Sequence, residues 1–457
     1  MTKSAEHFDL IVVGAGSGNS VLAADFDHWR VAIVERNTFG GTCLNRGCIP
    51  SKMFVYAADV AHQAGNTANL GVDSSLNGVR WGDIVNRVFG RIDPIAQSGE
   101  EYRQSQPNVT VFKGQARFIG HKTLDVNGQQ ISGEQIILAA GARPFVPPIP
   151  GLTSASEAQV EYHTSDSIMR LTKLPEHLII LGGGYIASEL AHVFNALGSA
   201  VTIVNRSERL LAVVDEDISA AFTKHMVERM NCILNSPVIN VKQVGSEITV
   251  TTKARAISGD VLLVAAGRVP NADQLEVTCT GVNVGPQGHV ITDEFLRTNV
   301  EGIWALGDIC HSIQLKHTAN EDTRVVAHNI AHPEDLRRPN YSGIPYAVFS
   351  HPQIASVGAT EQQLRTEKRV YKRVVRYYSD TAYAWAMEDT SSFVKLLADP
   401  KTNLLLGAHI IGPQAPILIQ QLIQGMQFQL TVQQMARGQL YIHPALTEVV
   451  EQALLEF

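Results

Sequence analysis

Apolar runs that end in glycine recur along the chain and predict strands followed by tight turns. The first is FDLIVVGAGSGNSVLAADF, where an apolar run over residues 8–13 leads into Gly14, Gly16 and Gly18 and then into a helix-like segment. Gly14 permits the turn, and Gly16 lets the backbone approach a pyrophosphate, which the amides at a helix start would bind. Asn19 stands in the third glycine position of this fingerprint. The stretch therefore predicts a strand, a turn and a helix that bind a dinucleotide.

The strands that follow end in residues suited to the same site. The run RVAIVE delivers Glu35 about 20 residues after the first glycine, where a carboxylate can bind ribose hydroxyls. Two further strands that end in glycine turns are expected around residues 135–144 and 259–271. The strand GIWALGDIC ends at Asp308, a good position for a carboxylate that holds a ribityl or ribose hydroxyl.

A second dinucleotide fingerprint lies in HLIILGGGYIASELAHVFNALGSAVTIVNRSERLL, with Gly182, Gly184 and Ala187 in the fingerprint positions. Its second strand ends in Asn205 and Arg206, with Arg209 close behind, where a ribose-binding acid would be expected. Because an acid repels a 2′-phosphate and arginines attract one, the pattern predicts NADPH rather than NADH. The alternative is that both arginines are ordinary solvated surface charges.

Composition limits the kind of protein and its partners. A chain of 457 residues is long enough for several domains. With 45% hydrophobic residues, 18% charged residues and a net charge of −7, it has no general attraction to nucleic acid or anionic membranes. The N-terminus runs directly into an apolar strand without the pattern of a signal peptide, and no segment is apolar enough to span a bilayer. We expect a cytoplasmic protein without a nucleic-acid or membrane partner, in a compartment where structural disulfides are rare.

Two cysteines lie close together in GGTCLNRGCIPSKMF, Cys43 and Cys48. On a regular helix their Cα atoms would be about 8 to 9 Å apart, beyond the roughly 7 Å limit for a disulfide. Bridging therefore needs a loop or a distorted helix start, which Gly47 and Pro50 can supply, and such a small ring should be readily reducible. A zinc site is the main alternative, but it usually needs a second ligand pair, and none is present. The remaining cysteines are isolated and are expected to be buried or incidental: Cys232, Cys279 and Cys310.

A dithiol beside two nucleotide sites needs a group that accepts hydride and passes on electrons. A flavin does both, so we expect FAD in the first unit, NADPH in the second, and electron flow from NADPH through FAD to the Cys43–Cys48 pair and then to an outside acceptor. Lys52, on a helix that begins near Ile49, could approach the flavin edge and pair with Glu189, unless both are surface charges.

The candidate proton donor and acceptor lies in YIHPALTEVVEQALLEF near the C-terminus. His443 precedes a proline, and Glu448 follows at an expected helix start. A carboxylate there could fix the imidazole tautomer and raise its basicity, although a histidine in such a segment is more often structural.

The motifs GGTCLNRGCIPSK, GGGYIASE, AAGRVPN, ALGDI and HPALTE occur in this order. With them the chain resembles the pyridine nucleotide-disulfide oxidoreductases, the family of glutathione reductase, dihydrolipoamide dehydrogenase and mercuric reductase, over nearly its whole length. The resemblance implies an α/β homodimer with two Rossmann-like dinucleotide-binding domains, for FAD and NADPH, and a C-terminal α+β dimerisation domain. The expected limits are an FAD-binding domain over 1–155, an NADPH-binding domain over 156–272, a central segment over 273–338 that completes the FAD site, and an interface domain over 339–457.

The resemblance also implies a role for each residue of the matching motifs. Cys43 would attack the substrate and Cys48 would contact the flavin. His443, donated across the dimer interface, would form an acid-base dyad with Glu448, and Tyr185 would cover the nicotinamide pocket. The Lys52–Glu189 pair would lie near the flavin. The expected FAD contacts are Gly14, Gly16, Ser17, Gly18, Glu35, Gly41, Thr42, Lys52, Ala139, Gly141 and Asp308, and the expected NADPH contacts are Gly182, Gly184, Tyr185, Ile186, Arg206, Arg209, Gly267 and Arg268.

Stretches outside these motifs point to one branch of the family. KMFVYAADV, RVFGRIDPIAQSGEEYR, LKHTANEDTRVVAHN and YAWAMEDTS look like the branch that regenerates mycothiol from its disulfide. Lys316-His317 fits this branch, since many relatives carry Thr-Pro there beside the flavin. Mercuric reduction is disfavoured because the C-terminus lacks an extra cysteine pair. Dihydrolipoamide dehydrogenase is the enzymatic alternative, although its NAD specificity would predict an acid at Asn205. A flavoprotein scaffold with structural cysteines is the alternative of another class.

Overall fold

The computed structural model describes residues 5–153 and 160–457. Its contacts divide the chain into two compact units. The first comprises Met1–Pro50, Val85–Phe145 and Gly267–Tyr341, and the second comprises Ser51–Ile84, Val146–Ala266 and Ser342–Phe457. The expected domain boundary between residues 155 and 156 lies outside the described residues.

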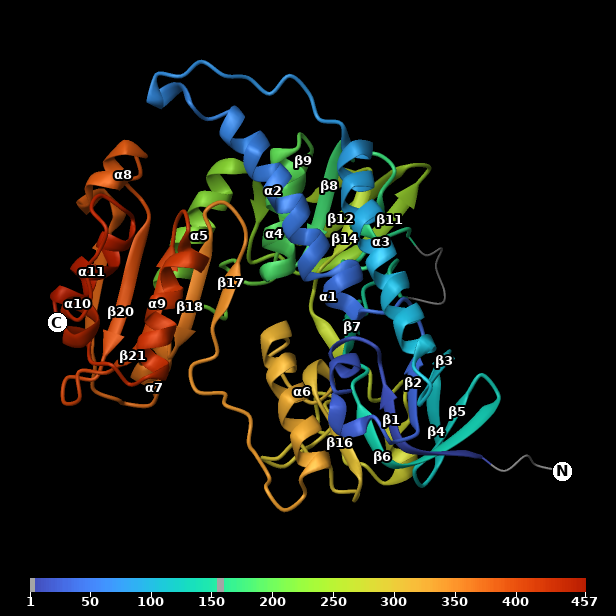
Figure 1. Cartoon of the computed structure of the whole chain (residues 1–457). Coiled ribbons are helices and arrows are strands. Elements are labelled where there is room, and N and C mark those ends of the chain that lie inside the picture. Colours follow the sequence, from blue (N-terminus) through green and yellow to red (C-terminus); the bar gives the residue numbers. More distant parts are fainter. Residues whose placement is uncertain (1–4, 154–159) are drawn as a thin grey trace. The chain divides into compact units, whose positions relative to one another are not determined.

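The first unit is built on a seven-stranded sheet in the order β3-β2-β1-β6-β5-β4, with β16 paired to β6 (Figure 1). Its strands are β1 (Glu6–Val13), β2 (Val31–Glu35), β3 (Val109–Lys113), β4 (Ala116–Gly120), β5 (Thr123–Val126), β6 (Gln129–Leu138) and β16 (Ile303–Ala305). The pairs β1–β2, β2–β3, β1–β6 and β16–β6 are parallel. Along β1, Ile11 and Val13 enter one core while Leu10 and Val12 enter the core on the other face. Burial on both faces explains why the strand is a continuous apolar run.

Helices and a small two-stranded sheet complete the first unit. The elements are α1 (Gly41–Arg46), the start of α2 (Cys48–Ala64), most of α3 (Trp81–Ser105), α6 (Lys316–Ala331), the antiparallel strands β7 (Ala142–Pro144) and β15 (Arg268–Pro270), and the 3-10 helices η1 (Ser17–Ser20), η2 (Ala24–Phe26), η5 (Val277–Thr280) and η6 (Gly307–Ile309). Val325, Val326 and Ile330 of α6 pack into the core that holds Leu10 and Val12.

The prediction of an α-helix after the first glycine turn is wrong, because the short 3-10 helices η1 and η2 form there instead. In an α-helix the Asn19 carbonyl would accept a hydrogen bond from the amide four residues later. Here it accepts one from the Arg103 guanidinium at 2.6 Å. Glycine and asparagine also have low helix propensity. A pyrophosphate at this turn would therefore meet backbone amides without the dipole of a long helix.

The second unit contains a four-stranded parallel sheet in the order β10-β9-β8-β14 and a three-stranded antiparallel sheet, β11-β12-β13. The strands are β8 (His177–Leu181), β9 (Ala200–Val204), β10 (Asn231–Ile233), β11 (Val238–Val244), β12 (Glu247–Thr252), β13 (Ala256–Gly259) and β14 (Val261–Val264). The helices of this part are α4 (Tyr185–Ala196) and α5 (Glu216–Arg229), with 3-10 helices η3 (Ala68–Leu70) and η4 (Ile168–Arg170).

The C-terminal part of the second unit is a five-stranded antiparallel sheet in the order β17-β18-β21-β20-β19. Its elements are β17 (Tyr346–Val348), β18 (Ile354–Gly358), α7 (Glu361–Thr366), β19 (Lys372–Tyr377), η7 (Tyr378–Asp380), α8 (Ala382–Ala386), β20 (Phe393–Ala398), β21 (Leu405–Ile411), α9 (Ala415–Gln427), α10 (Val432–Arg437) and α11 (Thr447–Leu455). Helices α9 and α11 pack on this sheet. Together the sheets confirm the expected α/β class, with a mixed sheet whose central strands are parallel in the first unit, and a parallel sheet and a C-terminal α+β part in the second.

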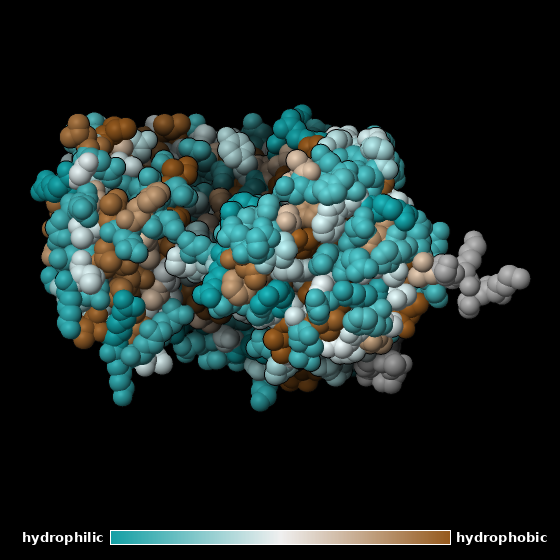
Figure 2. All heavy atoms as spheres, turned by 60° about the horizontal axis from the view of Figure 1, so that its bottom comes forward, coloured by the Kyte–Doolittle hydropathy of each residue, from teal (hydrophilic) through white to brown (hydrophobic). Residues whose placement is uncertain are grey.

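Several large hydrophobic side chains remain exposed on the C-terminal part. Leu440 is 99% exposed and Ile442 is 75% exposed, and Ile417 and Phe428 are also exposed. The face shown in Figure 2 carries hydrophobic residues among polar ones at the left, where this part of the chain lies. Exposed apolar groups in such number are typical of a surface that binds a partner.

Two stretches group differently from the expected domains. Ser51–Ile84 belongs to the second unit rather than to the FAD-binding segment. The reason is aromatic packing, since Trp81 lies 5.2 Å from the Phe54 ring and 5.4 Å from the Phe194 ring of α4. Residues 267–272 belong to the first unit, because β15 pairs with β7. The other expected limits stay predictions.

Among the residues that the structure describes, no helix is long and apolar enough to cross a membrane.

Candidate active site

The first glycine turn leaves a backbone surface almost free of side chains. Gly14 follows β1 directly, and its amide donates to the Val34 carbonyl at 2.8 Å. Gly16 lies against Gly41, the first residue of α1, so closely that a Cβ on Gly41 would be 2.6 Å from the Gly16 Cα. Glycine is therefore required at position 41, and the resulting close approach of the two backbone segments suits the passage of a diphosphate. The turn therefore fits the pyrophosphate of a dinucleotide.

Glu35, at the end of β2, forms hydrogen bonds with the backbone of this turn. Its carboxylate is buried and accepts hydrogen bonds from the Ala15 and Asn37 amides, both at 2.8 Å. A carboxylate has further acceptor sites, so these bonds leave capacity for a ribose hydroxyl. Ribose binding by Glu35 stays a prediction.

Other expected cofactor residues gather in the same unit. Ala139 follows β6, and its amide donates to the Val13 carbonyl at 2.9 Å. Gly141 is in the left-handed region and has open space where a side chain would lie. Asp308 is in η6, and burial raises the pKa of its carboxyl group, while Arg268 acts in the opposite direction.

Arg268 lies in a different unit from the one that the sequence predicts. The sequence assigns Gly267 and Arg268 to the NADPH site, but both residues belong to the first unit. The Arg268 guanidinium donates to the Ala142 carbonyl at 2.6 Å and lies 4.0 Å from the carboxylate of Asp308, an expected FAD residue. One of its side-chain contacts is therefore with a residue assigned to the first cofactor, and the other is with the backbone of β7.

The two close cysteines are separated by a break between helices, as expected. Cys43 lies in α1, which ends at Arg46, and Cys48 is the first residue of α2. Gly47 forms the break, and a Cβ there would be 2.9 Å from the Thr42 carbonyl oxygen. The glycine thus lets the chain fold back on α1. Both cysteines are free thiols, one half-buried and one exposed.

The thiols of the pair influence each other electrostatically. A hydrogen bond to the Cys48 side chain, together with burial, raises the pKa of Cys43 well above its usual range. The Lys316 ammonium acts in the opposite direction and favours the thiolate. Two neighbouring thiols that cannot both ionise easily are suited to share one negative charge.

The isolated cysteines show no comparable pairing. Burial raises the pKa of Cys232 to about 11 and raises that of Cys310 above its ordinary value. Cys279 is exposed, and its thiol lies 4.0 Å from Glu276. Within the described ranges, no group of three or more His, Cys, Asp or Glu side chains is arranged to hold a metal.

The second fingerprint has the strand, turn and helix that the sequence predicts. β8 ends at Leu181, and α4 begins at Tyr185 with Gly184 as its N-cap. The helix is 12 residues long, so its N-terminal amides and dipole can face an anion. Tyr185 is 42% exposed at this end, as a ring that covers a ligand would need to be. Ile186 follows in the same turn of the helix.

The strand after this turn ends in the predicted basic group. Asn205 is buried, and its side chain donates to the Ser207 and Arg209 carbonyls. Arg206 is exposed, and no ion pair engages it among the described residues. Arg209 is half-buried and faces Glu208 at 3.4 Å and Glu216 at 3.9 Å. Of the two arginines, Arg206 is the one available to an anion.

Lys52 and Glu189 form the expected ion pair, which rejects the interpretation that both are surface charges. The Lys52 ammonium donates to both Glu189 carboxylate oxygens, at 2.8 and 2.7 Å. Glu189 is buried and also accepts the Phe349 amide at 3.0 Å, while the ammonium lies 4.7 Å from the centre of the Phe349 ring. The carboxylate is thus fixed by the backbone and in turn fixes the lysine.

His443 and Glu448 are also joined. The imidazole Nδ1 lies 2.7 Å from a Glu448 carboxylate oxygen, and the carboxylate is largely buried at the start of α11. The imidazole itself is 74% exposed. This geometry fixes the tautomer and leaves the ring open to a partner. The dyad belongs to the second unit, whereas the two cysteines belong to the first.

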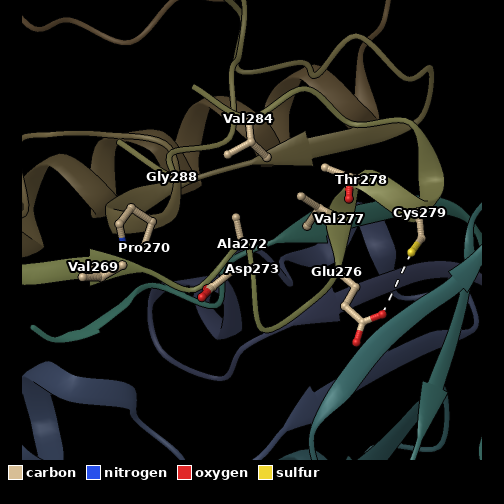
Figure 3. Close-up of a pocket in the computed structure, with 10 residues that line it drawn as sticks. All are labelled: Val269, Pro270, Ala272, Asp273, Glu276, Val277, Thr278, Cys279, Val284 and Gly288. Atoms are coloured by element: carbon tan, nitrogen blue, oxygen red, sulfur yellow. Dashed lines mark hydrogen bonds between the residues drawn. The ribbon is translucent and has the colours of Figure 1, made fainter. Parts of the chain in front are cut away.

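Figure 3 shows a cavity of about 430 Å³ in the first unit. Its walls are mostly apolar, including Pro270, Val277 and Val284, and Glu276 lies at one end with its carboxylate toward Cys279. Among the described residues, the lining includes neither Cys43 nor Cys48 and none of the expected cofactor residues.

Sequence reasoning missed two contacts that shape the first cofactor turn. Arg103 of α3 is buried and donates from Nε to the Asn19 side chain at 2.7 Å. Lys316 donates from Nζ to the Ser17 hydroxyl at 2.8 Å. Neither contact can be predicted from a short stretch of sequence, because the partners are far apart in the chain. The departure from Thr-Pro at Lys316 was the only indication of the second contact.

Comparison with known proteins covers most of the chain. Residues 8–323 match the family model described as pyridine nucleotide-disulphide oxidoreductase, and residues 344–454 match the dimerisation domain of the same family. A mycothione reductase from Mycobacterium tuberculosis is 46% identical, and the alignment covers 98% of this chain and 99% of the relative.

More distant relatives share the length and the fold. A dihydrolipoyl dehydrogenase from Chlamydia trachomatis is 32% identical over 98% of this chain and 97% of its own length. The solved structure of the HOCl-induced flavoprotein disulfide reductase RclA from Escherichia coli is 29% identical, with a TM-score of 0.86, over 98% of this chain and 99% of that one.

Proposed function

The chain belongs to the pyridine nucleotide-disulphide oxidoreductase family, and from this premise we propose that it reduces mycothiol disulfide with electrons from NADPH. It is an FAD-containing, NAD(P)H-dependent disulfide oxidoreductase with a dimerisation domain. The proposal concerns the substrate, the preference for NADPH and the role of each residue. We also propose a cytoplasmic location, since a reducing compartment keeps a catalytic dithiol available.

The observation that carries the substrate assignment is the full-length identity with mycothione reductase. It reaches 46% over 98% of this chain, whereas a dihydrolipoyl dehydrogenase reaches 32% over the same share. Because the catalytic motifs are common to the family, they do not distinguish these relatives, and the higher overall identity favours mycothiol disulfide. A small-molecule disulfide is the substrate class in either case.

The first unit supplies the residues that would hold FAD. The Gly14 to Ser17 turn and Gly41 would admit the pyrophosphate, and Glu35 and Asp308 would bind hydroxyl groups. Bound FAD supplies a group that takes a hydride from NADPH and returns an electron pair to a disulfide. Lys52, fixed by Glu189, would place a positive charge near that group.

The cysteines would carry the electrons to the substrate. The Cys43 thiolate attacks one sulfur of the substrate disulfide, forms a mixed disulfide and expels the first thiolate, which takes a proton from His443 of the partner subunit. The Cys48 thiolate then attacks Cys43 Sγ, which releases the second substrate thiolate and leaves the Cys43–Cys48 disulfide. Glu448 stabilises the imidazolium and holds its tautomer. Each cycle consumes two electrons and two protons and yields two thiols.

The substrate assignment predicts a clear order of catalytic efficiency. Purified enzyme with NADPH should reduce mycothiol disulfide with a kcat/KM about 100-fold or more above that for glutathione disulfide or lipoamide, because a site that binds the polar groups of one substrate rejects analogues without them. Steady-state NADPH oxidation measures all three. A comparable kcat/KM for lipoamide would favour the dihydrolipoamide dehydrogenase alternative and reject the assignment.

The basic group after β9 predicts the choice of nicotinamide cofactor. Arg206→Ala should raise the KM for NADPH by about 10- to 100-fold and leave the KM for NADH nearly unchanged, since a charge-assisted bond to the 2′-phosphate contributes about 1.5 to 3 kcal/mol. Arg255→Ala is the matched control, because Arg255 is an exposed arginine of the same unit that pairs with Asn231. Equal effects of Arg206→Ala on both cofactors would show that Arg206 does not bind the phosphate.

A further inference from the structure

The Lys316 ammonium lies beside the first glycine turn, which packs against the start of the helix that carries Cys43. Lys316 is the first residue of α6 and is half-buried. Its ammonium donates to the Ser17 hydroxyl at 2.8 Å, and no carboxylate lies within ion-pair distance of it in the part of the chain that the structure describes. A partly buried ammonium is costly unless an anion or dipole compensates for its lost hydration. An anion that forms during disulfide reduction, such as a cysteine thiolate, would compensate for this charge.

Two contacts hold Ser17, and so the ammonium, in place. The Thr323 hydroxyl, from the second turn of α6, donates to the Ala319 carbonyl at 2.7 Å, and its oxygen also lies 3.3 Å from the Ser17 carbonyl oxygen. The adjacent Gly16 packs directly against Gly41, two residues before Cys43. The start of α6, the glycine turn and the start of α1 are thus linked by direct contacts within one unit.

The positive charge of Lys316 acts electrostatically on the thiol of Cys43. Among the groups that act on Cys43, the Cys48 thiol and burial raise its pKa, while the Lys316 ammonium lowers it. The positive charge of Lys316 opposes the effects of burial and of Cys48, so removing that charge should raise the pKa of Cys43 further.

We propose that Lys316 is a positioning residue for the dithiol: its ammonium, held by Ser17, stabilises the thiolate of Cys43 in the reduced enzyme. The proposal rests on the proposed disulfide reduction but not on the identity of the disulfide. It gives the chain a fixed positive charge within the subunit that carries the cysteines, in addition to the histidine expected from the partner.

The test measures the thiol directly in the FAD-loaded, full-length protein after reduction with NADPH under anaerobic conditions. Iodoacetamide labels the thiolate form, and mass spectrometry of the digested protein resolves labelling at Cys43 from labelling at other cysteines. Lys316→Gln keeps a hydrogen-bond donor for Ser17 and removes the charge, and Lys316→Arg keeps the charge. At neutral pH, Lys316→Gln should slow alkylation of Cys43 by about tenfold and displace the alkylation profile to higher pH, and Lys316→Arg should restore most of the rate.

The matched control is Lys122→Gln in the same unit. The Lys122 ammonium donates to the Glu134 carbonyl of β6 at 2.8 Å rather than to the first glycine turn. The control should alkylate at the wild-type rate. FAD content per subunit, read from absorbance of the released flavin, is measured for every variant.

The outcomes separate the possible roles. An unchanged alkylation profile in Lys316→Gln, with FAD content also unchanged, overturns the proposal. Loss of FAD from Lys316→Gln with normal alkylation in the FAD-loaded fraction also overturns it and assigns the ammonium to the cofactor phosphate. Failure to reduce mycothiol disulfide would reject the proposed substrate and leave the alkylation result intact.

Discussion

Replacing Cys43 with serine is expected to lower disulfide reduction on the order of 10⁴-fold or more, the scale of loss when an essential nucleophile is removed. The same variant should show a long-wavelength absorbance band in its oxidised flavin spectrum without any reductant. The reason is that Cys48, freed from its disulfide partner, would remain as a thiolate against the oxidised flavin. Absorbance spectra and NADPH oxidation with mycothiol disulfide measure both effects.

Two controls decide the roles of the thiols. Cys48→Ser should also abolish turnover but should lack the band, so a band in Cys48→Ser and none in Cys43→Ser would reverse the assignment. Cys279→Ser removes an exposed thiol that is not paired with another cysteine, and it should keep wild-type activity. If neither active-site variant loses activity, the cysteines are structural and the scaffold alternative gains support.

The strands and turns were largely predictable because their signals are local. The apolar run before Gly14, the acid at the end of β2 and the second fingerprint around Gly182 all lie in the expected elements. The segment after Gly16 was not predictable, because the contact that prevents a helix comes from Arg103, which lies 84 residues from Asn19. Local helix propensity does not contain that information.

The contacts of the candidate site likewise include some that the sequence predicts and one that it does not. His443 and Glu448 lie five residues apart, so a helix start is enough to bring them together. Lys52 and Glu189 are 137 residues apart, and their pairing was expected from the position of each in a family motif. The contact between Lys316 and Ser17 spans 299 residues, and although Ser17 lies in the first fingerprint, no motif pairs the two residues. Packing between distant segments determines such contacts.

The central claim is that a complete site needs Cys43 of one subunit and His443 of the other. Cys43→Ser and His443→Gln homodimers should each be inactive, because one lacks the nucleophile and the other lacks the acid-base group. A mixed dimer contains one site with both residues intact. Glu448 remains in every subunit, so any loss in His443→Gln reports on the imidazole.

The most direct test is to unfold and refold the two variants together in equal amounts and to measure NADPH-dependent disulfide reduction. Random pairing makes half of the dimers mixed, with one of two sites working, so activity should return to about a quarter of the wild-type value. Different affinity tags on the two variants show independently that subunits have exchanged, and each variant refolded alone is the control. With exchange demonstrated, recovery near a quarter supports a site shared between subunits, and no recovery above the homodimers would contradict it.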